Sequence, residues 1–177
     1  MEQMDLFAGT SSFNPYYDED EYTTEQLEQL KLGFLHGIAF SIYDRKELDA
    51  KQMEKFRLDL EKNVSSYDYN GNIFNIKQMI EITCALNQDL DPSVFAKSEF
   101  DDNQMRQIRW GLEYKLDVSI YARPEFDHYQ MREIRLGLWK DLDVSCYAKP
   151  NYDAIIMKVI RDDLESAKKR EKKNKSE

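Results

Sequence analysis

A spacing of 26 residues recurs along most of the chain and constrains its fold more than any other feature. The dipeptide Gln-Met occurs four times at this interval, and the same column continues in both directions without an insertion. We call the residues of this column anchors and count offsets from them. The six anchors are Leu27, Met53, Met79, Met105, Met131 and Met157. Such internal repetition is typical of proteins that stack copies of one small unit.

Each repeat begins with the pattern of an amphipathic helix. Apolar residues recur at offsets 0, 3, 7 and 11, which lie on one side of an α-helix. Thr, Asn or Asp stands four residues before every anchor, where its side-chain oxygen can cap the first amides. In five repeats a Gln follows three residues later and completes a capping box. We therefore predict helices of about 12 residues, or about 18 Å, that reach offset 11.

The second half of each repeat predicts a shorter helix. Asp91, Asp117 and Asp143 can cap one or two turns, and proline follows in the later repeats. Two further columns are predicted to fill the core between helices: Tyr43, Tyr69, Phe95, Tyr121 and Tyr147, then Leu48, Phe74, Phe100, Phe126 and Tyr152. The first two repeats carry DRKELD and DYNGNIFN in this place, so the pattern predicts no clear short helix there.

These patterns together predict an all-α protein, an α-solenoid of about six repeats in which each unit completes its neighbour's core. We expect the repeat domain to span residues 14–166, with residues 14–22 as a leading cap. Residues 1–13 should form a flexible peptide. The segment SAKKREKKNKSE abandons the pattern, so residues 167–177 are expected to be a charged, disordered tail.

The repeat consensus, QMREIRLGL followed by LDVSxYAxPxF, resembles short helical repeats in proteins of Firmicutes and their mobile elements. The resemblance covers about residues 17–166. It implies a helical-repeat fold and does not imply any activity.

A second resemblance lies before the repeats. Gln3-Met4-Asp5-Leu6-Phe7 resembles the pentapeptide by which bacterial replication and repair proteins bind the DNA sliding clamp. The resemblance implies that Leu6 and Phe7 fill apolar pockets on the clamp, that Gln3 hydrogen-bonds deeper in the cleft, and that Asp5 matches the motif's third position. The alternatives are that this segment folds back onto the first repeat or has no partner.

Cations and tryptophans recur on the long helices of the last three repeats. Offsets 1, 4, 5 and 8 lie away from the apolar side, and they carry Arg106, Arg109, Trp110, Arg132, Arg135, Trp139, Lys158 and Arg161. Stacked helices would align these residues into a surface for phosphates, an acidic peptide or exposed bases. The alternative is internal pairing with nearby carboxylates such as Glu113 and Glu133, with the tryptophans packed against glycines.

The chain carries no signature of an enzyme, a metal site or a cofactor site. It lacks a P-loop, a nucleophile elbow, an HExxH motif and a dinucleotide fingerprint. Cys84 and Cys146 have no ligand spacing and are predicted to be core residues. The start lacks the regions of a signal peptide, and no segment approaches a membrane span, so we expect a cytoplasmic protein without membrane contact.

Charge is distributed unevenly along the chain. The formal net charge is −9; residues 1–100 carry 9 basic and 19 acidic residues (−10), and residues 101–177 carry 16 and 15 (+1). These features favour a non-enzymatic protein-binding repeat protein that the N-terminal peptide tethers to the sliding clamp. One alternative is a mobile-element anti-defence inhibitor, an acidic decoy of a nucleic-acid-processing complex. The less favoured alternative is direct nucleic-acid binding by the Arg/Trp face of the C-terminal half.

Overall fold

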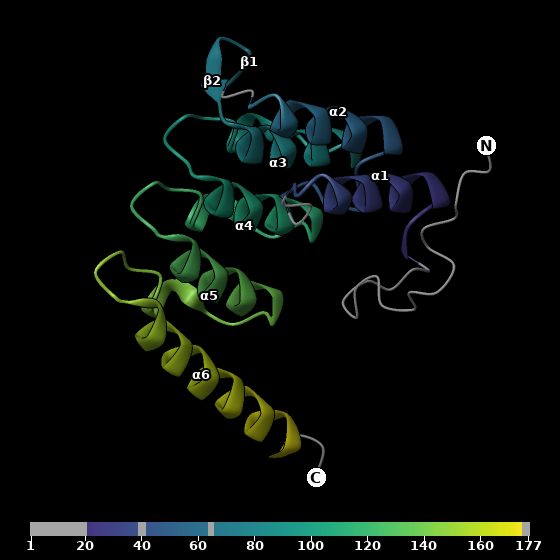
Figure 1. Ribbon diagram of the computed structural model, residues 1–177. Coiled ribbons are helices and arrows are strands. Elements are labelled where there is room, and N and C mark those ends of the chain that lie inside the picture. The colour runs from purple at the N-terminus through teal and green to yellow at the C-terminus, as the bar shows by residue number, and fades with distance from the viewer. Residues whose placement is uncertain (1–20, 39–41, 64–65, 175–177) are drawn as a thin grey trace, which may run out of the picture. The chain divides into compact units, whose positions relative to one another are not determined.

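The computed structural model describes residues 21–38, 42–63 and 66–174, and these residues are mostly helical (Figure 1). The long helices are α1 (Thr24–Leu35), α2 (Ala50–Glu61), α3 (Ile76–Asn87), α4 (Asp102–Glu113), α5 (His128–Trp139) and α6 (Ala154–Asn174). Single 3₁₀ turns follow three of them: η3 (Pro92–Val94), η4 (Val118–Ile120) and η5 (Val144–Cys146). A two-stranded sheet, β1 (Tyr67–Tyr69) and β2 (Asn72–Phe74), is the only non-helical element among these residues. The prediction of a predominantly helical chain is confirmed.

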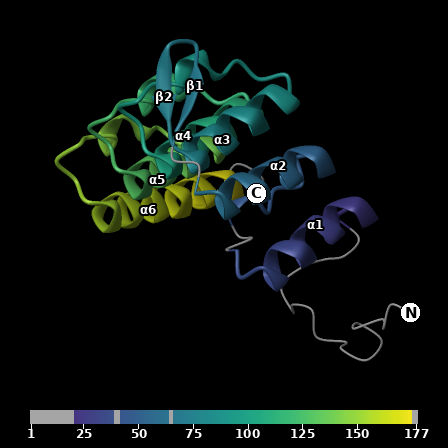
Figure 2. The ribbon, with the colours of Figure 1, turned by 45° about the horizontal axis from the view of Figure 1, so that its top comes forward.

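The chain divides into two compact units. The first comprises residues 1–57 and the second residues 58–177, so the boundary falls within α2. In the second unit α3 contacts α4, α4 contacts α5 and α5 contacts α6, and the four helices follow one another in chain order (Figure 2).

Every long helix begins directly after its predicted cap. Thr23, Asn75, Asp101 and Asp127 each form a complete capping box with the glutamine three residues later. Asp49 exchanges the same two hydrogen bonds with its glutamine, at 2.8 and 2.9 Å. These starts were predictable because the capping contacts join residues only three positions apart.

The capping glutamines have a second role that the sequence pattern did not indicate. Gln104 Nε2 donates a hydrogen bond to the carbonyl oxygen of Phe126, 22 residues later, at 2.7 Å. Gln78 and Gln130 make the equivalent bonds to Phe100 and Tyr152. Each glutamine thus ties the start of its helix to the end of its own repeat.

The helices end earlier in the repeat than expected. Five of them stop at offset 8, and offset 10 is a left-handed residue in each: Gly37, Asn63, Asp89, Lys115 and Asp141. At α4 the amide of Leu116, at offset 11, donates to the carbonyl of Gly111 at 2.9 Å, as in a Schellman cap. The predicted length is correct, but offset 11 lies past the helix. The sequence did not indicate the ends of α4 and α5, because Lys115 and Asp141 are not usual residues at a left-handed cap.

The second halves of the repeats have the shortest predicted length or are of another kind. Asp91, Asp117 and Asp143 cap as expected, and each caps a single turn of 3₁₀ type. In the second repeat a hairpin replaces the short helix. Asn70 and Gly71 both adopt positive φ at its turn, as a two-residue turn requires.

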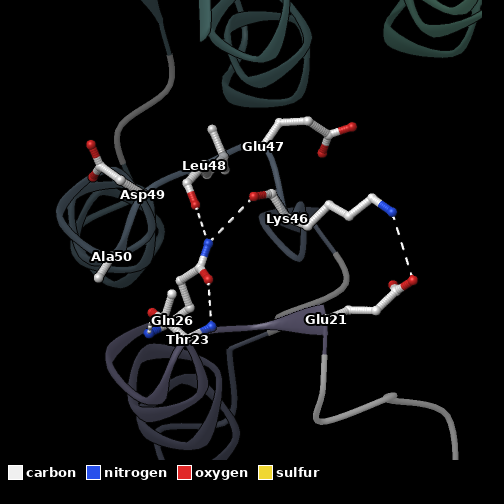
Figure 3. A pocket seen from close by; sticks show the side chains of 8 residues that line it. All are labelled: Glu21, Thr23, Gln26, Lys46, Glu47, Leu48, Asp49 and Ala50. Carbon is white, nitrogen blue, oxygen red and sulfur yellow. Dashed lines mark hydrogen bonds and ion pairs between the residues drawn. The ribbon is translucent and has the colours of Figure 1, made fainter. Parts of the chain in front are cut away.

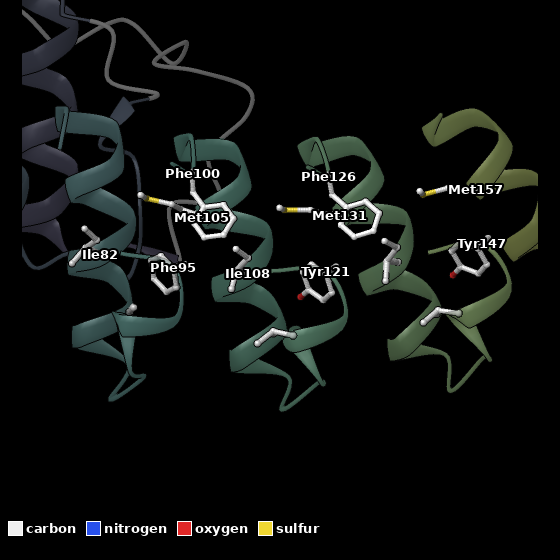
Figure 4. Close-up of a cluster of buried hydrophobic side chains, with 14 of the residues drawn as sticks. Ile82, Phe95, Phe100, Met105, Ile108, Tyr121, Phe126, Met131, Tyr147 and Met157 are labelled. Atoms are coloured by element: carbon white, nitrogen blue, oxygen red, sulfur yellow. The ribbon is translucent and has the colours of Figure 1, made fainter. Parts of the chain in front are cut away.

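The core of the second unit repeats the same contacts from helix to helix (Figure 4). The predicted columns supply most of its fully buried residues, namely Phe74, Ile82, Phe95, Phe100, Met105, Ile108, Tyr121, Phe126, Met131, Ile134, Tyr147 and Met157. Each side chain of this size stabilises the fold by about 1.5–3 kcal/mol when buried.

The predicted disordered tail is helical as far as the structure describes it. Helix α6 continues to Asn174 because its last turns lack Gly, Asn or Pro before that residue and are rich in Lys and Glu. Lys168 also donates to the carbonyl of Lys140, at 3.0 Å, and to the carboxylate of Asp141, at 2.8 Å. The α6 extension thereby caps the end of α5.

Candidate functional site

Neighbouring helices of the second unit are joined by charged contacts in a fixed register. An acceptor at offset 2 of one helix faces an arginine at offset 4 of the next. At the α3–α4 junction the Glu81 carboxylate accepts from Arg109 Nε at 3.0 Å and from Arg106 Nε at 2.7 Å. Arg109 is only 1% exposed. Two of the predicted surface cations therefore serve an internal ion-pair cluster.

The α5–α6 junction repeats this arrangement. Glu133 Oε2 lies 2.9 Å from Arg161 Nη1, and Asp162 lies 2.8 Å from Arg161 Nη2. Both Glu133 and Arg161 are buried. Arg161 is thus also engaged inside the chain.

The α4–α5 junction differs because its acceptor is neutral. Arg135 Nε donates to the amide oxygen of Gln107 at 3.1 Å, and its guanidinium lies over the Trp110 ring, 5.1 Å from the centroid. Arg135 is half-buried, and this burial lowers the pKa of its guanidinium. Within residues 21–38, 42–63 and 66–174, no carboxylate lies within ion-pair distance of Arg135 or of the exposed Arg132. Glu113 acts on Arg135 only at longer range, so the guanidinium has no ion-pair partner at this junction among the described residues.

Aromatic side chains surround this charge. Trp139 is 58% exposed and follows Arg135 by four residues on α5, so the two side chains share one helix face. Tyr114, just past α4, is 55% exposed and lies near Arg135. We define the Arg135 surface as Trp110, Tyr114, Arg132, Arg135 and Trp139.

A guanidinium beside exposed aromatic rings suits the binding of a flat or extended ligand that carries a negative charge. A guanidinium with unused donors binds a carboxylate strongly, since charge-assisted hydrogen bonds exceed neutral ones. Exposed tryptophan, tyrosine and arginine are also the residues that dominate protein interfaces.

The structure sorts the residues predicted to bind partners into three groups. Trp110, Arg132, Arg135 and Trp139 come together on the Arg135 surface. Arg106, Arg109 and Arg161 lie in internal ion pairs. Gln3, Asp5, Leu6 and Phe7 lie outside the described residues.

A hollow of about 430 Å³ in the first unit is structural in character (Figure 3). Gln26 crosses it to the carbonyl of Leu48 at 2.6 Å, and Thr23 caps α1 at its edge. Glu21 and Lys46 form an ion pair there at 3.7 Å. These groups hold the two halves of the first repeat together.

No cluster of three or more His, Cys, Asp or Glu that could hold a metal ion occurs in the part of the chain that the structure describes. Cys84 is buried as predicted, whereas Cys146 is exposed on η5. None of the helices in the described ranges is both long and apolar enough to cross a bilayer.

Sequence reasoning missed several exposed residues of the second unit. Tyr114 of the Arg135 surface was not singled out, and neither were Tyr129 on α5 and Ile155 on α6. A signal was present at offset −2, where Lys77 and Asn103 give way to Tyr129 and Ile155 in the last two repeats.

Comparison of the chain with protein families, with curated proteins and with solved structures finds no match.

Proposed function

We propose that this chain is a non-enzymatic protein-binding protein and that the Arg135 surface binds an acidic segment of its partner. The observation that carries the proposal is the neutral acceptor Gln107. It faces Arg135 at the register position where Glu81 faces Arg109 and Glu133 faces Arg161. A carboxylate supplied by a partner would complete at this junction the ion pair that the chain itself provides at the other two.

The small number of cations without an ion-pair partner favours a protein partner over a nucleic acid. Three of the cations in the predicted ladder, Arg106, Arg109 and Arg161, are neutralised within the chain. Nucleic-acid binding draws its affinity from many phosphate contacts. The three remaining cations, Arg132, Arg135 and Lys158, together with a net charge of −9, supply few of them. Direct nucleic-acid binding is therefore the weaker alternative.

The proposed scaffold for this surface is an α-solenoid. Helices that begin at 26-residue intervals, with repeated core positions and contacts between successive helices in the second unit, support this architecture. Such a scaffold would hold the residues of α4 and α5 in fixed register for a partner.

The variant Gln107→Glu tests the binding proposal. It supplies the missing carboxylate in cis, as at the α3–α4 junction, so the fold should be retained. We expect the affinity for a fluorescent polyglutamate peptide to fall about tenfold. Asn151→Glu, which adds the same charge at an exposed loop position, is the control and should bind like the wild type. Unchanged affinity of Gln107→Glu would contradict the proposal.

A single-stranded DNA oligonucleotide in the same assay separates the alternative. Binding that is tighter than that of polyglutamate, falls steeply with salt and is lost in Gln107→Glu would assign the Arg135 surface to nucleic acid.

We further propose that the N-terminal peptide tethers the protein to the DNA sliding clamp. The motif resemblance of residues 3–7 supports this part, and those residues lie outside the described ranges. A fluorescent peptide of residues 1–12 should bind purified clamp and should be displaced by a known clamp-binding peptide. Binding that survives Leu6→Ala with Phe7→Ala would contradict the tether.

The net charge of −10 over residues 1–100 supports a second candidate, an acidic decoy of a nucleic-acid-processing complex, as in anti-defence proteins of mobile elements. Pull-downs with and without residues 1–8 separate the two. Loss of the clamp alone supports the tether, whereas retention of a nuclease-type partner supports the decoy.

A further inference from the structure

The buried carboxylate of Glu133, at the α5–α6 junction, accepts no hydrogen bond from the described residues. Glu133 is 5% exposed, and its Oε2 lies 2.9 Å from Arg161 Nη1 without the geometry of a hydrogen bond. At the α3–α4 junction the equivalent carboxylate, Glu81, accepts from Arg106 Nε at 2.7 Å and from Arg109 Nε at 3.0 Å. Burial of a carboxylate costs free energy unless hydrogen bonds replace those it made with water. Glu133 therefore lacks the donors that Glu81 has.

A hollow of about 450 Å³ lies beside Glu133, between α5 and α6. At the α3–α4 junction the equivalent place is filled by the guanidinium of Arg106, which also contacts Asn103 Oδ1 at 3.4 Å. At α5–α6 the residue at this position is Lys158, and Ile155 stands where α4 has Asn103. In the described part of the chain no carboxylate lies within ion-pair distance of the Lys158 ammonium. The hollow is thus the place that a guanidinium occupies at the other junction.

The charges around the hollow favour a cation as its occupant. Its lining includes two carboxylates, Glu133 and the exposed Asp153, and one ammonium, that of Lys158. Behind Glu133 lies Arg161, which also contacts the carboxylate of Asp162 at 2.8 Å. These three carboxylates and two cations leave a formal charge of −1. Lys158 is exposed, so water and salt screen its repulsion of a second cation.

We infer that this hollow binds the guanidinium of an arginine side chain from a partner protein. The guanidinium donates to the Glu133 carboxylate, as Arg106 does to Glu81 within the chain. Its flat face and its apolar stem lie against Tyr129, 59% exposed, and Ile155, 75% exposed. This contact goes beyond the proposed function, because it takes a basic group of a partner and does not involve the Arg135 surface.

The chemistry of the lining favours arginine over other cations. A guanidinium is planar, weakly hydrated and able to stack on an aromatic ring, whereas an ammonium is compact and strongly hydrated. The chain uses this property at the α4–α5 junction, where the guanidinium of Arg135 lies 5.1 Å from the centre of the Trp110 ring. A metal ion is a poorer occupant, since no group of three potential ligands occurs among the described residues.

Three short peptides of glycine and serine test this inference. They carry a single central arginine, citrulline or lysine; citrulline has the shape of arginine without its charge. In titrations of the full chain, followed by the amide NMR signals of Tyr129 and Ile155, the arginine peptide should bind about tenfold more tightly than either of the others. Equal affinities for arginine and citrulline would overturn the inference. Equal affinities for arginine and lysine would overturn the assignment of a guanidinium.

The variant Lys158→Arg locates the effect without changing the charge. Its guanidinium should fill the hollow from within the chain, as Arg106 does, so the affinity for the arginine peptide should fall about tenfold. Lys97→Arg makes the same exchange at an exposed loop position and should bind like the wild type. Unchanged affinity of Lys158→Arg, or an equal loss in Lys97→Arg, would overturn the inference. Urea denaturation checks that both variants remain folded.

The variant Lys158→Gln distinguishes a cationic occupant from an anionic one. It removes the like charge beside the hollow, so the affinity for the arginine peptide should rise about threefold. An acidic peptide would instead lose affinity in this variant. Weaker binding of the arginine peptide to Lys158→Gln would contradict the proposed arrangement.

Discussion

Gly111 lies directly beneath the hydroxyl of Tyr121, and a Cβ atom at Gly111 would overlap that oxygen. The hydroxyl donates to the carbonyl of Gln107 at 3.1 Å, one turn earlier on α4. The same pairing recurs between Gly137 and Tyr147, and Tyr147 donates to the carbonyl of Glu133. The tyrosine side chain thus occupies the space that the glycine leaves on the helix.

In the third repeat both of these positions carry other residues. This repeat has Ala85 where the later repeats have glycine, and Phe95 where they have tyrosine. Both residues are fully buried. In this repeat the methyl group of alanine takes the place of the tyrosine hydroxyl. The second repeat, where a hairpin follows the helix, differs and carries Asp59 and Tyr69 at these positions.

This relationship predicts the effect of Gly111→Ala. In an exposed helix the change would stabilise by about 1 kcal/mol, but here overpacking should destabilise the fold by about 2 kcal/mol. Tyr121→Phe alone should cost about 1 kcal/mol through the lost hydrogen bond. The double variant should recover part of the loss from Gly111→Ala, measured by urea denaturation, because the new Cβ would still lie 2.7 Å from Val118 Cγ1. Strictly additive costs would show that the hydroxyl is not the obstacle.

The capping glutamines predict that substitutions at one repeat position affect stability differently in two repeats. Gln104→Ala should destabilise the fold by about 2 kcal/mol, because it removes half of a capping box and the bond to the Phe126 carbonyl. The equivalent residue of the last repeat is Ile156, which has no later segment to hold within the described residues. Ile156→Gln should therefore change stability by less than about 0.5 kcal/mol. Equal effects at the two positions would contradict this role.

The buried ion pairs predict that Glu81→Gln and Gln107→Glu, at equivalent positions, differ in their effect on stability. Glu81→Gln leaves Arg106 and Arg109 without their shared carboxylate, and Arg109 is almost fully buried. The variant should lose about 3 kcal/mol of stability. The opposite exchange, Gln107→Glu, should not destabilise, since it gives Arg135 a partner. Thermal denaturation of the two variants measures both effects.

The contact between the end of α5 and the middle of α6 predicts a pH dependence. Hydrogen bonds from Lys140 and Lys169 lower the pKa of Glu165 from 4.5 to about 2. Because the folded pKa lies below the unfolded one, the stabilisation is complete above about pH 4.5 and is lost as the pH falls toward 2. Glu165→Gln should thus lower the urea midpoint near neutral pH and have little effect at about pH 2. A difference that persists at low pH would contradict this assignment.

Truncation after Ser166 provides an independent check of the α6 extension. It removes Lys168, which binds the carbonyl of Lys140 and the carboxylate of Asp141. We expect a loss of about 1 kcal/mol and faster amide exchange at the end of α5. An unchanged midpoint would indicate that the extension adds nothing to α5.

The sequence predicted the features that depend on residues close together in the chain or on a strict period. The caps at Thr23, Asp101 and Asp127 were identified because each bonds within one turn. The core columns followed from the 26-residue repetition, since identical units bury identical positions. The helix ends were misplaced because the apolar residues at offset 11 continue the helical pattern, and Lys115 and Asp141 do not show the left-handed position that Gly37 and Asn63 mark in the first two repeats. The departure DYNGNIFN removed the prediction of a short helix in the second repeat, but the hairpin that the Asn70-Gly71 turn supports was not predicted.

The amino-acid sequence by itself thus determined the period, the helix starts and the side chains of the core, because these follow from local hydrogen bonds and from hydrophobic periodicity. Only the tertiary structure decided which arginines face a carboxylate and which remain uncompensated. Arg109 and Arg135 occupy the same repeat position, but their partners, Glu81 and Gln107, lie 28 residues away on the preceding helix. Whether a cation is internal or available therefore depends on contacts between helices, which the pattern of a single helix does not contain.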